Sequence, residues 1–161
     1  MKKALSLFLA LTLLLSMASF LNVYAADEVI FSDSFENGID NWKYTSSKCN
    51  EENTNLSTDK ATDGKTSAYV YDAGDGTFGY RGNTMPAEPG KTYIVSFDHF
   101  NVEGCGAKVF VEFLDDADKR IQSTSFGSSK TGEWESLTKE FVAPGGTKSV
   151  RLYITGSGSG S

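Results

Sequence analysis

The sequence lacks most of the motifs from which catalytic and metal sites are built. Its 161 residues include one histidine and two cysteines, with no CxxC pair and no Cys/His cluster, which argues against a zinc site. No GxSxG, HExxH or P-loop pattern occurs. One GxGxxG pattern is present at residues 74–79. The stretch "YRGNTMPAEPG" follows it and cannot form the helix that a dinucleotide site requires.

Basic residues are outnumbered by acidic ones. The chain has 15 Lys and Arg against 21 Asp and Glu, which gives a formal net charge of −6. Nucleic acids need a basic surface, so this balance argues against them as partners. It also disfavours an anionic membrane surface, and it leaves neutral polymers open as partners.

A long apolar run occurs only at the N-terminus, where "ALSLFLALTLLLSM" follows Lys2 and Lys3 and precedes a small residue, Ala25. This pattern predicts a secretory signal peptide over residues 1–25 and therefore a secreted protein. A membrane anchor is the weaker alternative, because small and polar residues interrupt the end of the run. Cleavage after Ala25 would leave 136 of the 161 residues, enough for one domain, and would change the net charge from −6 to −8 by removing two lysines.

Both cysteines, Cys49 and Cys105, lie in the part of the chain that would be exported. A disulfide is permitted there, and closing this 56-residue separation would stabilise the fold by about 4 kcal/mol in the loop-entropy model. Two separate thiols are an equally open alternative.

Helical periodicity is nearly absent after the leader. Short alternating runs separated by Gly, Asn, Asp or Pro predict strands at residues 29–35, 67–72, 78–82, 92–100, 107–114, 120–126, 134–142 and 148–155. Eight short strands in one modest domain indicate an all-β fold, an antiparallel β-sandwich of jelly-roll type, over residues 26–155. The final residues, 156–161, alternate Gly and Ser and are predicted to be a flexible linker or a fragment end, after which a further domain could follow.

Period-two alternation divides each predicted strand between a core face and an outer face. The residues expected in the core are Ala68, Val70, Tyr93, Val95, Phe97, Val109, Val111, Phe113, Val150, Leu152 and Ile154. Five rings fall on outer positions: Tyr69, Tyr71, Phe100, Phe110 and Tyr153. If their strands share one sheet, these rings line one surface, and exposed aromatic clusters usually mark a binding face. Tyr80 and the polar Asp98, Glu112 and Arg151 complete the predicted binding set.

Three other features have two readings each. Asp98 and Glu112, placed on neighbouring strands, would form a possible acid/nucleophile pair, although two solvated acids or sugar-hydroxyl acceptors explain them as well. The only histidine, His99, takes an inward position and is better explained as a buried group with one hydrogen-bond partner than as a general base. Trp42 and Trp134 are sugar platforms or, more simply, rings that seal the edge of the sandwich.

Acidic residues also gather at predicted strand ends. Asp33, Glu36 and Asp40 lie in "FSDSFENGIDNW", and Asp63 lies in "ATDGKTS". Carboxylates near turns suit Ca²⁺, which accepts carboxylate and carbonyl oxygens together, while ordinary turn residues are an equally good reading.

Five segments, taken in order and spacing, resemble the CenC-like carbohydrate-binding modules, which are jelly-roll domains attached to cellulases, xylanases and related secreted enzymes. The segments are "FSDSFENGIDNW", "ATDGKTSAYV", "PGKTYIVSFD", "GEWESLTKEFVAP" and "KSVRLYIT". The resemblance covers residues 29–155. It implies a concave sheet that forms a glycan cleft, and a structural Ca²⁺ far from that cleft. Glu36 and the segment around Asp63 match the usual position of the ion, with Asp33 nearby. The chain departs from the family at its end, where Gly and Ser stand in place of a strand carrying a metal-binding Asp.

Taken together, the residues and the resemblance predict non-catalytic binding of a polysaccharide such as β-glucan, cellulose or xylan. The sugar rings would stack on aromatic side chains, and each stack removes roughly 60 Å² from water, worth about 1.5 kcal/mol. Two or three stacks, less the ordering cost, predict a Kd of roughly micromolar to millimolar. The alternatives are an adhesion domain that binds protein and a small glycanase that uses Asp98 and Glu112.

Overall fold

The computed structural model describes residues 28–71, 78–104 and 106–156, and the residues from Phe31 onward form one unit. Ten strands are present in the described part of this unit: β1 (Trp42–Tyr44), β2 (Thr54–Ser57), β3 (Ser67–Val70), β4 (Gly79–Gly82), β5 (Met85–Pro86), β6 (Thr92–Phe100), β7 (Ala107–Leu114), β8 (Arg120–Gly127), β9 (Trp134–Val142) and β10 (Ser149–Gly156). The all-β, antiparallel fold predicted from the sequence is confirmed. In the described ranges, no helix is long and apolar enough to cross a membrane.

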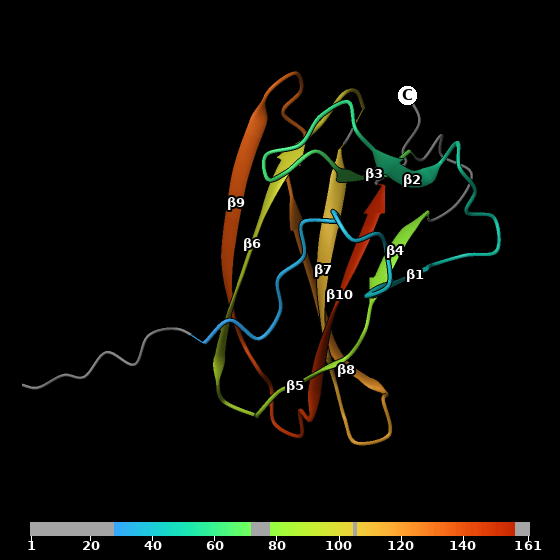
Figure 1. The fold of residues 1–161 in the computed structure, drawn as a ribbon. Coiled ribbons are helices and arrows are strands. Elements are labelled where there is room, and N and C mark those ends of the chain that lie inside the picture. Colours follow the sequence, from blue (N-terminus) through green and yellow to red (C-terminus); the bar gives the residue numbers. More distant parts are fainter. Residues whose placement is uncertain (1–27, 72–77, 105, 157–161) are drawn as a thin grey trace, which may run out of the picture. The chain divides into compact units, whose positions relative to one another are not determined.

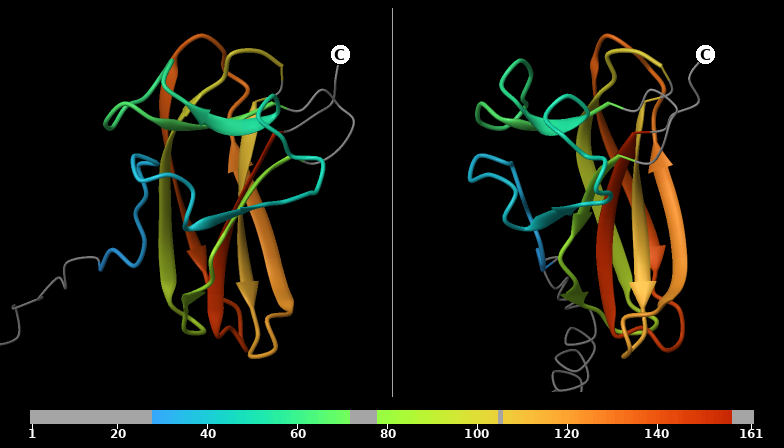
Figure 2. Two further views of the ribbon diagram at one scale, coloured as in Figure 1. Left: turned by 45° about the vertical axis from the view of Figure 1, so that its right-hand side comes forward. Right: turned by 90° about the vertical axis from the view of Figure 1, so that its right-hand side faces the viewer.

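The largest sheet, called sheet A below, has the strand order β1-β4-β10-β7-β8 (Figure 1). β5 also pairs with β10, on the same side as β4, so β4 and β5 act as one strand interrupted at Asn83 and Thr84. All pairings in the sheet are antiparallel. The right-hand view of Figure 2 shows β10, β7 and β8 side by side.

Two smaller sheets complete the unit. β6 and β9 pair over nine residues to form sheet C, and β2 and β3 pair over four to form sheet B. Sheets A and C pack face to face, because Val111, Phe113 and Val150 of sheet A share one hydrophobic cluster with Phe141 of β9 and Tyr93 of β6. The unit is therefore a sandwich with an outer face on each of these two sheets.

The alternation predicted for the long strands is confirmed. Val111 and Phe113 have no exposed surface, and Val109 and Val150 are at least 95% buried. A second group of rings fills the space between sheet A and the loop before β1: Trp42 packs against Phe31 and Phe35, and Tyr80 packs against Trp42 and Tyr44. Trp42 is buried, in agreement with its predicted structural role.

The predicted strand at residues 29–35 is wrong. Asp33 ends the extended stretch, because its Oδ1 accepts a hydrogen bond from the backbone N–H of Phe35 at 2.8 Å, and Phe35 has a positive φ of 63°. The Asp33 carboxylate thus closes a turn. This turn allows the loop before β1 to place Phe31 and Phe35 against Trp42.

Strands β6, β7 and β9 have the predicted bounds, and β10 extends to Gly156, which the sequence assigns to the linker. The stretch "LDDADKRI" predicts a hairpin turn whose acids cap backbone donors, and the structure confirms it. Asp115 Oδ1 accepts hydrogen bonds from the N–H groups of Ala117 and Lys119, each at 2.9 Å. Strands β1, β2 and β5 are not predicted from the sequence, because runs of two to four residues are too short to show alternation. The predicted leader, most of the GxGxxG pattern and the residues after Gly156 lie outside the described residues.

Candidate functional site

The outer face of sheet A collects polar and aromatic side chains from five strands in a defined register. Across the middle of the sheet run Lys43, Arg81, Tyr153, Phe110 and Ser125, each paired with the next on the neighbouring strand. The adjacent row contains Arg151, Glu112 and Ser123. Alternation places these side chains on the side away from the core, because their sequence neighbours Val111 and Leu152 pack in it.

Phe110 and Tyr153 form the aromatic centre of this face. Their ring centroids lie 5.8 Å apart with an interplanar angle of 64°, an edge-to-face contact. Both side chains are partly exposed. The contact holds each ring in one orientation, so the face presents a pre-formed apolar patch at its middle.

Glu112 organises the polar part of the same face. Its Oε2 accepts a hydrogen bond from Arg151 Nε at 2.7 Å, and its Oε1 accepts one from Arg120 Nη1 at 2.9 Å. Glu112 is only 5% exposed, and this burial opposes its ionisation, but the two arginines outweigh it and lower the pKa of the carboxyl. Glu112 therefore stays charged and positions both arginines, rather than offering a free carboxylate to a ligand.

This ion-pair network makes stability depend on pH. A carboxyl whose pKa is lowered by folding stabilises the native state above its unfolded pKa of about 4.3, and this contribution is lost as the pH falls through the folded pKa. We expect Glu112→Gln to cost about 1–2 kcal/mol at pH 7, with the exposed Arg120 contributing little. The gap between the variant and the wild type should close toward pH 3 in urea unfolding. Glu140→Gln, which removes an exposed carboxylate, is the matched control, and a gap that does not change with pH would contradict this role.

The prediction that five aromatic residues line one sheet is wrong. Phe100 lies on β6 and belongs to the outer face of sheet C, where its ring meets Trp134 edge to face at 5.5 Å and is covered by Lys60 Nζ at 4.3 Å. Asp98 is on the same face, and its Oδ1 accepts a hydrogen bond from Ser136 Oγ at 2.6 Å. Trp134, for which a structural role is favoured, is 36% exposed and packs against Phe100. Sequence alternation assigns residues to inner or outer faces but cannot tell which of two sheets a strand joins.

Tyr69 and Tyr71 lie on neither of these two outer faces. Tyr69 lies on β3 in sheet B and Tyr71 follows that strand, and they are 37% and 44% exposed. The pKa of Tyr69 is raised by burial and by the nearby Tyr71 and Glu103. These two rings form a separate exposed pair on sheet B.

The assignment of Tyr80 to the binding set is also wrong. Its side chain has no exposed surface, and its hydroxyl donates a 2.6 Å hydrogen bond to the backbone oxygen of Asn55 on β2. Burial raises the pKa of this phenol. Tyr80 pairs with Ile154 in register and therefore points to the inner side of sheet A, where it joins that sheet to sheet B.

The structure contradicts the suggested catalytic pair of Asp98 and Glu112. Asp98 lies on the outer face of sheet C and Glu112 on the outer face of sheet A, with the hydrophobic core between them. A glycosidase needs its two carboxyl groups within about 10 Å, on either side of one bond. The glycanase alternative therefore loses its proposed residues.

Three cationic residues of the outer face of sheet A were not predicted from the sequence. Arg81 lies next to Tyr153, Lys43 lies next to Arg81, and Lys108 lies two residues before Phe110. Arg81 alternates with Tyr80 on a predicted strand, so a correct inward assignment of Tyr80 would have found it. Lys43 is on a three-residue strand that gives no pattern to read.

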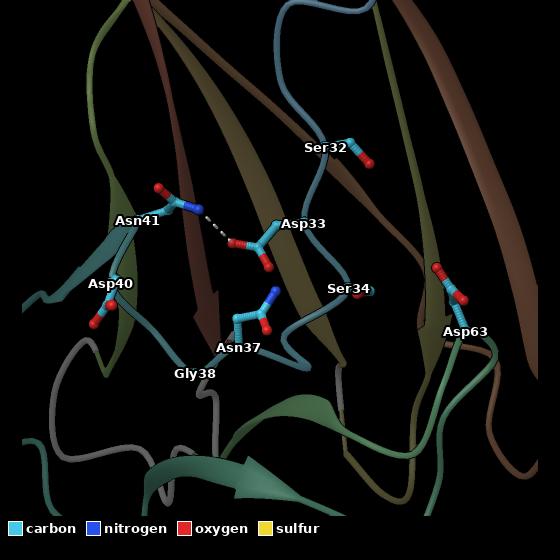
Figure 3. A pocket seen from close by; sticks show the side chains of 8 residues that line it. All are labelled: Ser32, Asp33, Ser34, Asn37, Gly38, Asp40, Asn41 and Asp63. Carbon is cyan, nitrogen blue, oxygen red and sulfur yellow. Dashed lines mark hydrogen bonds between the residues drawn. The ribbon is translucent and has the colours of Figure 1, made fainter.

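The region predicted to bind calcium is a polar pocket, lined by Ser32, Asp33, Ser34, Asn37, Gly38, Asp40, Asn41 and Asp63 (Figure 3). Asp33 Oδ2 accepts hydrogen bonds from Trp42 Nε1 at 2.9 Å and from Asn41 Nδ2 at 3.2 Å. Asp63 stands apart from Asp33 on another loop (Figure 3).

Glu36, the third predicted calcium ligand, is not among the lining residues of this pocket. Its Oε1 accepts hydrogen bonds from the backbone N–H groups of Lys65 at 2.7 Å and Thr66 at 2.5 Å. These hydrogen bonds lower the pKa of the Glu36 carboxyl. In the ranges that the structure describes, no three acidic, His or Cys side chains gather in a group that could hold a metal. Asp33 and Glu36 each accept hydrogen bonds from N–H donors, and calcium binding stays a prediction from the sequence.

Cys49 carries a free thiol, 3.7 Å from Thr45 Oγ1 and 3.9 Å from the Gly79 oxygen. Cys105 lies outside the described residues. His99 is buried, and its Nε2 accepts a hydrogen bond from Ala107 N–H at 3.3 Å, which confirms the expected buried group with one hydrogen-bond partner. Burial lowers the pKa of His99 despite the nearby Glu135.

Comparison with known families identifies the class of protein. A family model described as "Carbohydrate binding domain" (CBM_4_9) matches residues 27–160, so the chain belongs to this family of carbohydrate-binding domains. Among curated proteins, no sequence match is found.

Solved structures support the same fold. The chain is similar to the CBM22-1 xylan-binding domain of Paenibacillus barcinonensis Xyn10C, with 19% identity, a TM-score of 0.56, and coverage of 81% of this chain and 86% of that one. It is also similar to a Family 16 Carbohydrate Binding Module-2, with 18% identity, a TM-score of 0.56, and coverage of 80% and 88%. The enzymatically active domain of bacteriophage CBA120 tailspike protein 4 matches with 18% identity and a TM-score of 0.57 over 77% of this chain, but the chain spans 18% of its length. At these identities the likeness concerns the fold.

Proposed function

We propose that this domain binds a polysaccharide across the outer face of sheet A, with Phe110 and Tyr153 as the stacking platform. The main support for this proposal is the edge-to-face pair of partly exposed rings at the centre of that face. Arg81, Arg151 and the serines of β8 border this pair. An extended glycan chain presents apolar CH faces that stack on rings and hydroxyl groups that bond to polar side chains. The outer face of sheet A offers both.

The arrangement fits weak, reversible binding. Each stacked sugar contributes about 1.5 kcal/mol of apolar burial, and two stacks with a few hydrogen bonds correspond to a Kd of roughly micromolar to millimolar. Such affinity suffices for a module that holds a tethered enzyme near an insoluble polymer, because the linker raises the effective concentration. We propose a secreted, non-catalytic targeting domain of this kind, attached to a glycoside hydrolase and related to the CenC-like modules.

The test is affinity electrophoresis of the mature chain in gels that contain cellulose derivatives, xylan, mannan or β-glucan. We expect retardation in at least one gel, and Phe110→Ala should weaken it about tenfold, the loss of one stack. Phe100→Ala is the matched control, because it removes the same side chain from the outer face of sheet C. Its retardation should equal that of the wild type.

Two results would contradict the proposal. Equal retardation of the wild type and Phe110→Ala would move the binding site away from sheet A. No retardation on any polysaccharide, together with binding to a cell-wall protein, would favour the adhesion domain instead.

A further inference from the structure

The charges of this acidic protein are distributed unequally over its surface. The five strands β1, β4, β10, β7 and β8 of sheet A contain all three arginines of the sequence and two of its lysines. They contain only one of its 21 acidic residues. The basic residues are Lys43, Arg81, Lys108, Arg120 and Arg151, and the acidic one is Glu112. Although the chain has more acidic than basic residues, the strands of sheet A therefore carry a net positive charge.

The register keeps two of these cations together. Lys43 on β1 lies directly opposite Arg81 on β4, and both are exposed. Like charges opposite each other on a sheet destabilise it by a few tenths of a kcal/mol or more. Within the described ranges, neither residue forms an ion pair, whereas Lys130 in a loop pairs with Glu133 at 2.8 Å. An anionic group bound between Lys43 and Arg81 would relieve this repulsion.

Glu112 leaves the other arginines able to bind a ligand. The Glu112 carboxylate accepts hydrogen bonds from Nε of Arg151 and Nη1 of Arg120, and each guanidinium has five N–H donors. The remaining donors of Arg151 lie beside Tyr153, which is two residues away on the same face of β10. A guanidinium fixed in this way is suited to a carboxylate, which it can bind through two parallel hydrogen bonds.

The outer face of sheet C has the opposite character. Its strands β6 and β9 contain Asp98 and Glu140 on the outer side and one lysine, Lys139. Lys139 pairs with Val95, an inner-face residue, and its Nζ lies 5.6 Å from the Phe141 ring. Among strand residues, the excess of basic charge thus lies on the face that carries Phe110 and Tyr153.

We infer that the ligand is an acidic polysaccharide whose sugar chain carries uronic acid carboxylates. This inference rests on the proposed function, because it places the sugar rings on Phe110 and Tyr153 and their carboxylates on Arg81, Lys43 and Arg151. The two rings favour a ligand made of sugars over other polyanions. The arginines favour a ligand that carries carboxylates. The basic residues of this face would attract acidic chains locally, whereas the acidic residues elsewhere on the protein would repel them.

The test uses ligand pairs that differ only in charge. Glucuronoxylan, polygalacturonate, alginate and xanthan are each compared with their carboxyl-reduced form, by affinity electrophoresis of the full chain at about 50 mM and about 500 mM NaCl. We expect at least one acidic polymer to bind several-fold more tightly than its reduced form, with the difference shrinking at high salt. Dextran sulfate and poly(dT) test whether sulfate or any polyanion serves as well.

Variants locate the effect on the face. Arg81→Gln and Lys43→Gln should each weaken binding to the acidic polymer about two- to fivefold, and should weaken binding to the reduced polymer by a smaller factor. Lys91→Gln removes one positive charge from an exposed position in the turn before β6 and should change neither.

The outcomes separate the two proposals. If every acidic polymer bound as tightly as its reduced form, the proposal of an acidic ligand would be overturned. The proposal of polysaccharide binding would still stand. Binding to none of the eight polymers would overturn the acidic ligand, and failure on the neutral gels as well would overturn both. Equally tight binding of poly(dT) or dextran sulfate would show that the face responds to charge alone and would also overturn the uronate assignment.

Discussion

The double variant Phe110→Ala/Tyr153→Ala is expected to lose polysaccharide binding by up to about 100-fold. Two stacks at about 1.5 kcal/mol each give about 3 kcal/mol, and every 1.4 kcal/mol is a factor of ten in Kd. Because the two rings touch edge to face, each one also orients the other. The loss in the double variant should therefore be smaller than the product of the two single losses. Isothermal titration with the best polymer from the gel panel measures all four proteins.

The same experiment has a matched control on sheet B. Tyr69→Ala/Tyr71→Ala also removes two exposed rings, which alternation in the sequence places on outer positions just as it does Phe110 and Tyr153. The structure places them away from Phe110 and Tyr153, so this control should bind as the wild type does. If the control lost binding and the Phe110/Tyr153 variant kept it, the site would lie on sheet B. Urea unfolding with an unchanged m-value would show that both variants keep the fold.

Gly79→Ala is expected to produce the largest loss of stability. Gly79 opens β4 with φ of 151°, in a region that only glycine adopts readily. A Cβ at this position would lie 1.9 Å from the backbone oxygen of Ile154 on β10. Backbone cannot move aside as a side chain can, so the pairing of β4 with β10 would have to open. We expect the free energy of unfolding to fall by about 3 kcal/mol or more, measured by urea unfolding.

Gly82→Ala, at the other end of the same strand, is the control. A Cβ there would lie 3.4 Å from the Leu152 oxygen and from the Trp42 ring, which is ordinary contact or slightly closer, and its φ is not positive. We expect a change below about 1 kcal/mol. Since β4 also carries Arg81, Gly79→Ala should weaken binding to acidic polymers even where it remains folded. A stability equal to that of Gly82→Ala would show that β4 does not approach β10 as closely as described.

Local pattern was sufficient for the long strands of this domain. β6, β7 and β9 follow from alternation, and the same alternation gives the inner residues Val111 and Phe113, because a two-residue period fixes the face of every side chain in a strand. The Asp115 turn also followed from sequence, since its hydrogen bonds are made within five residues. Short strands such as β1 contain too few residues for a period to appear.

By itself, the sequence determined the fold class, the long strands, the inner and outer side of each, and the overall acidity of the chain. Only the tertiary structure decided which outer residues meet: Phe110 joins Tyr153, while Phe100 lies across the core and Tyr69 lies on sheet B. It also gathered all the arginines on one face, with Glu112 beneath two of them. The physical reason is that side-chain direction is a property of a single strand, whereas sharing a sheet depends on hydrogen bonds between segments as far apart in the sequence as Gly79 and Thr155.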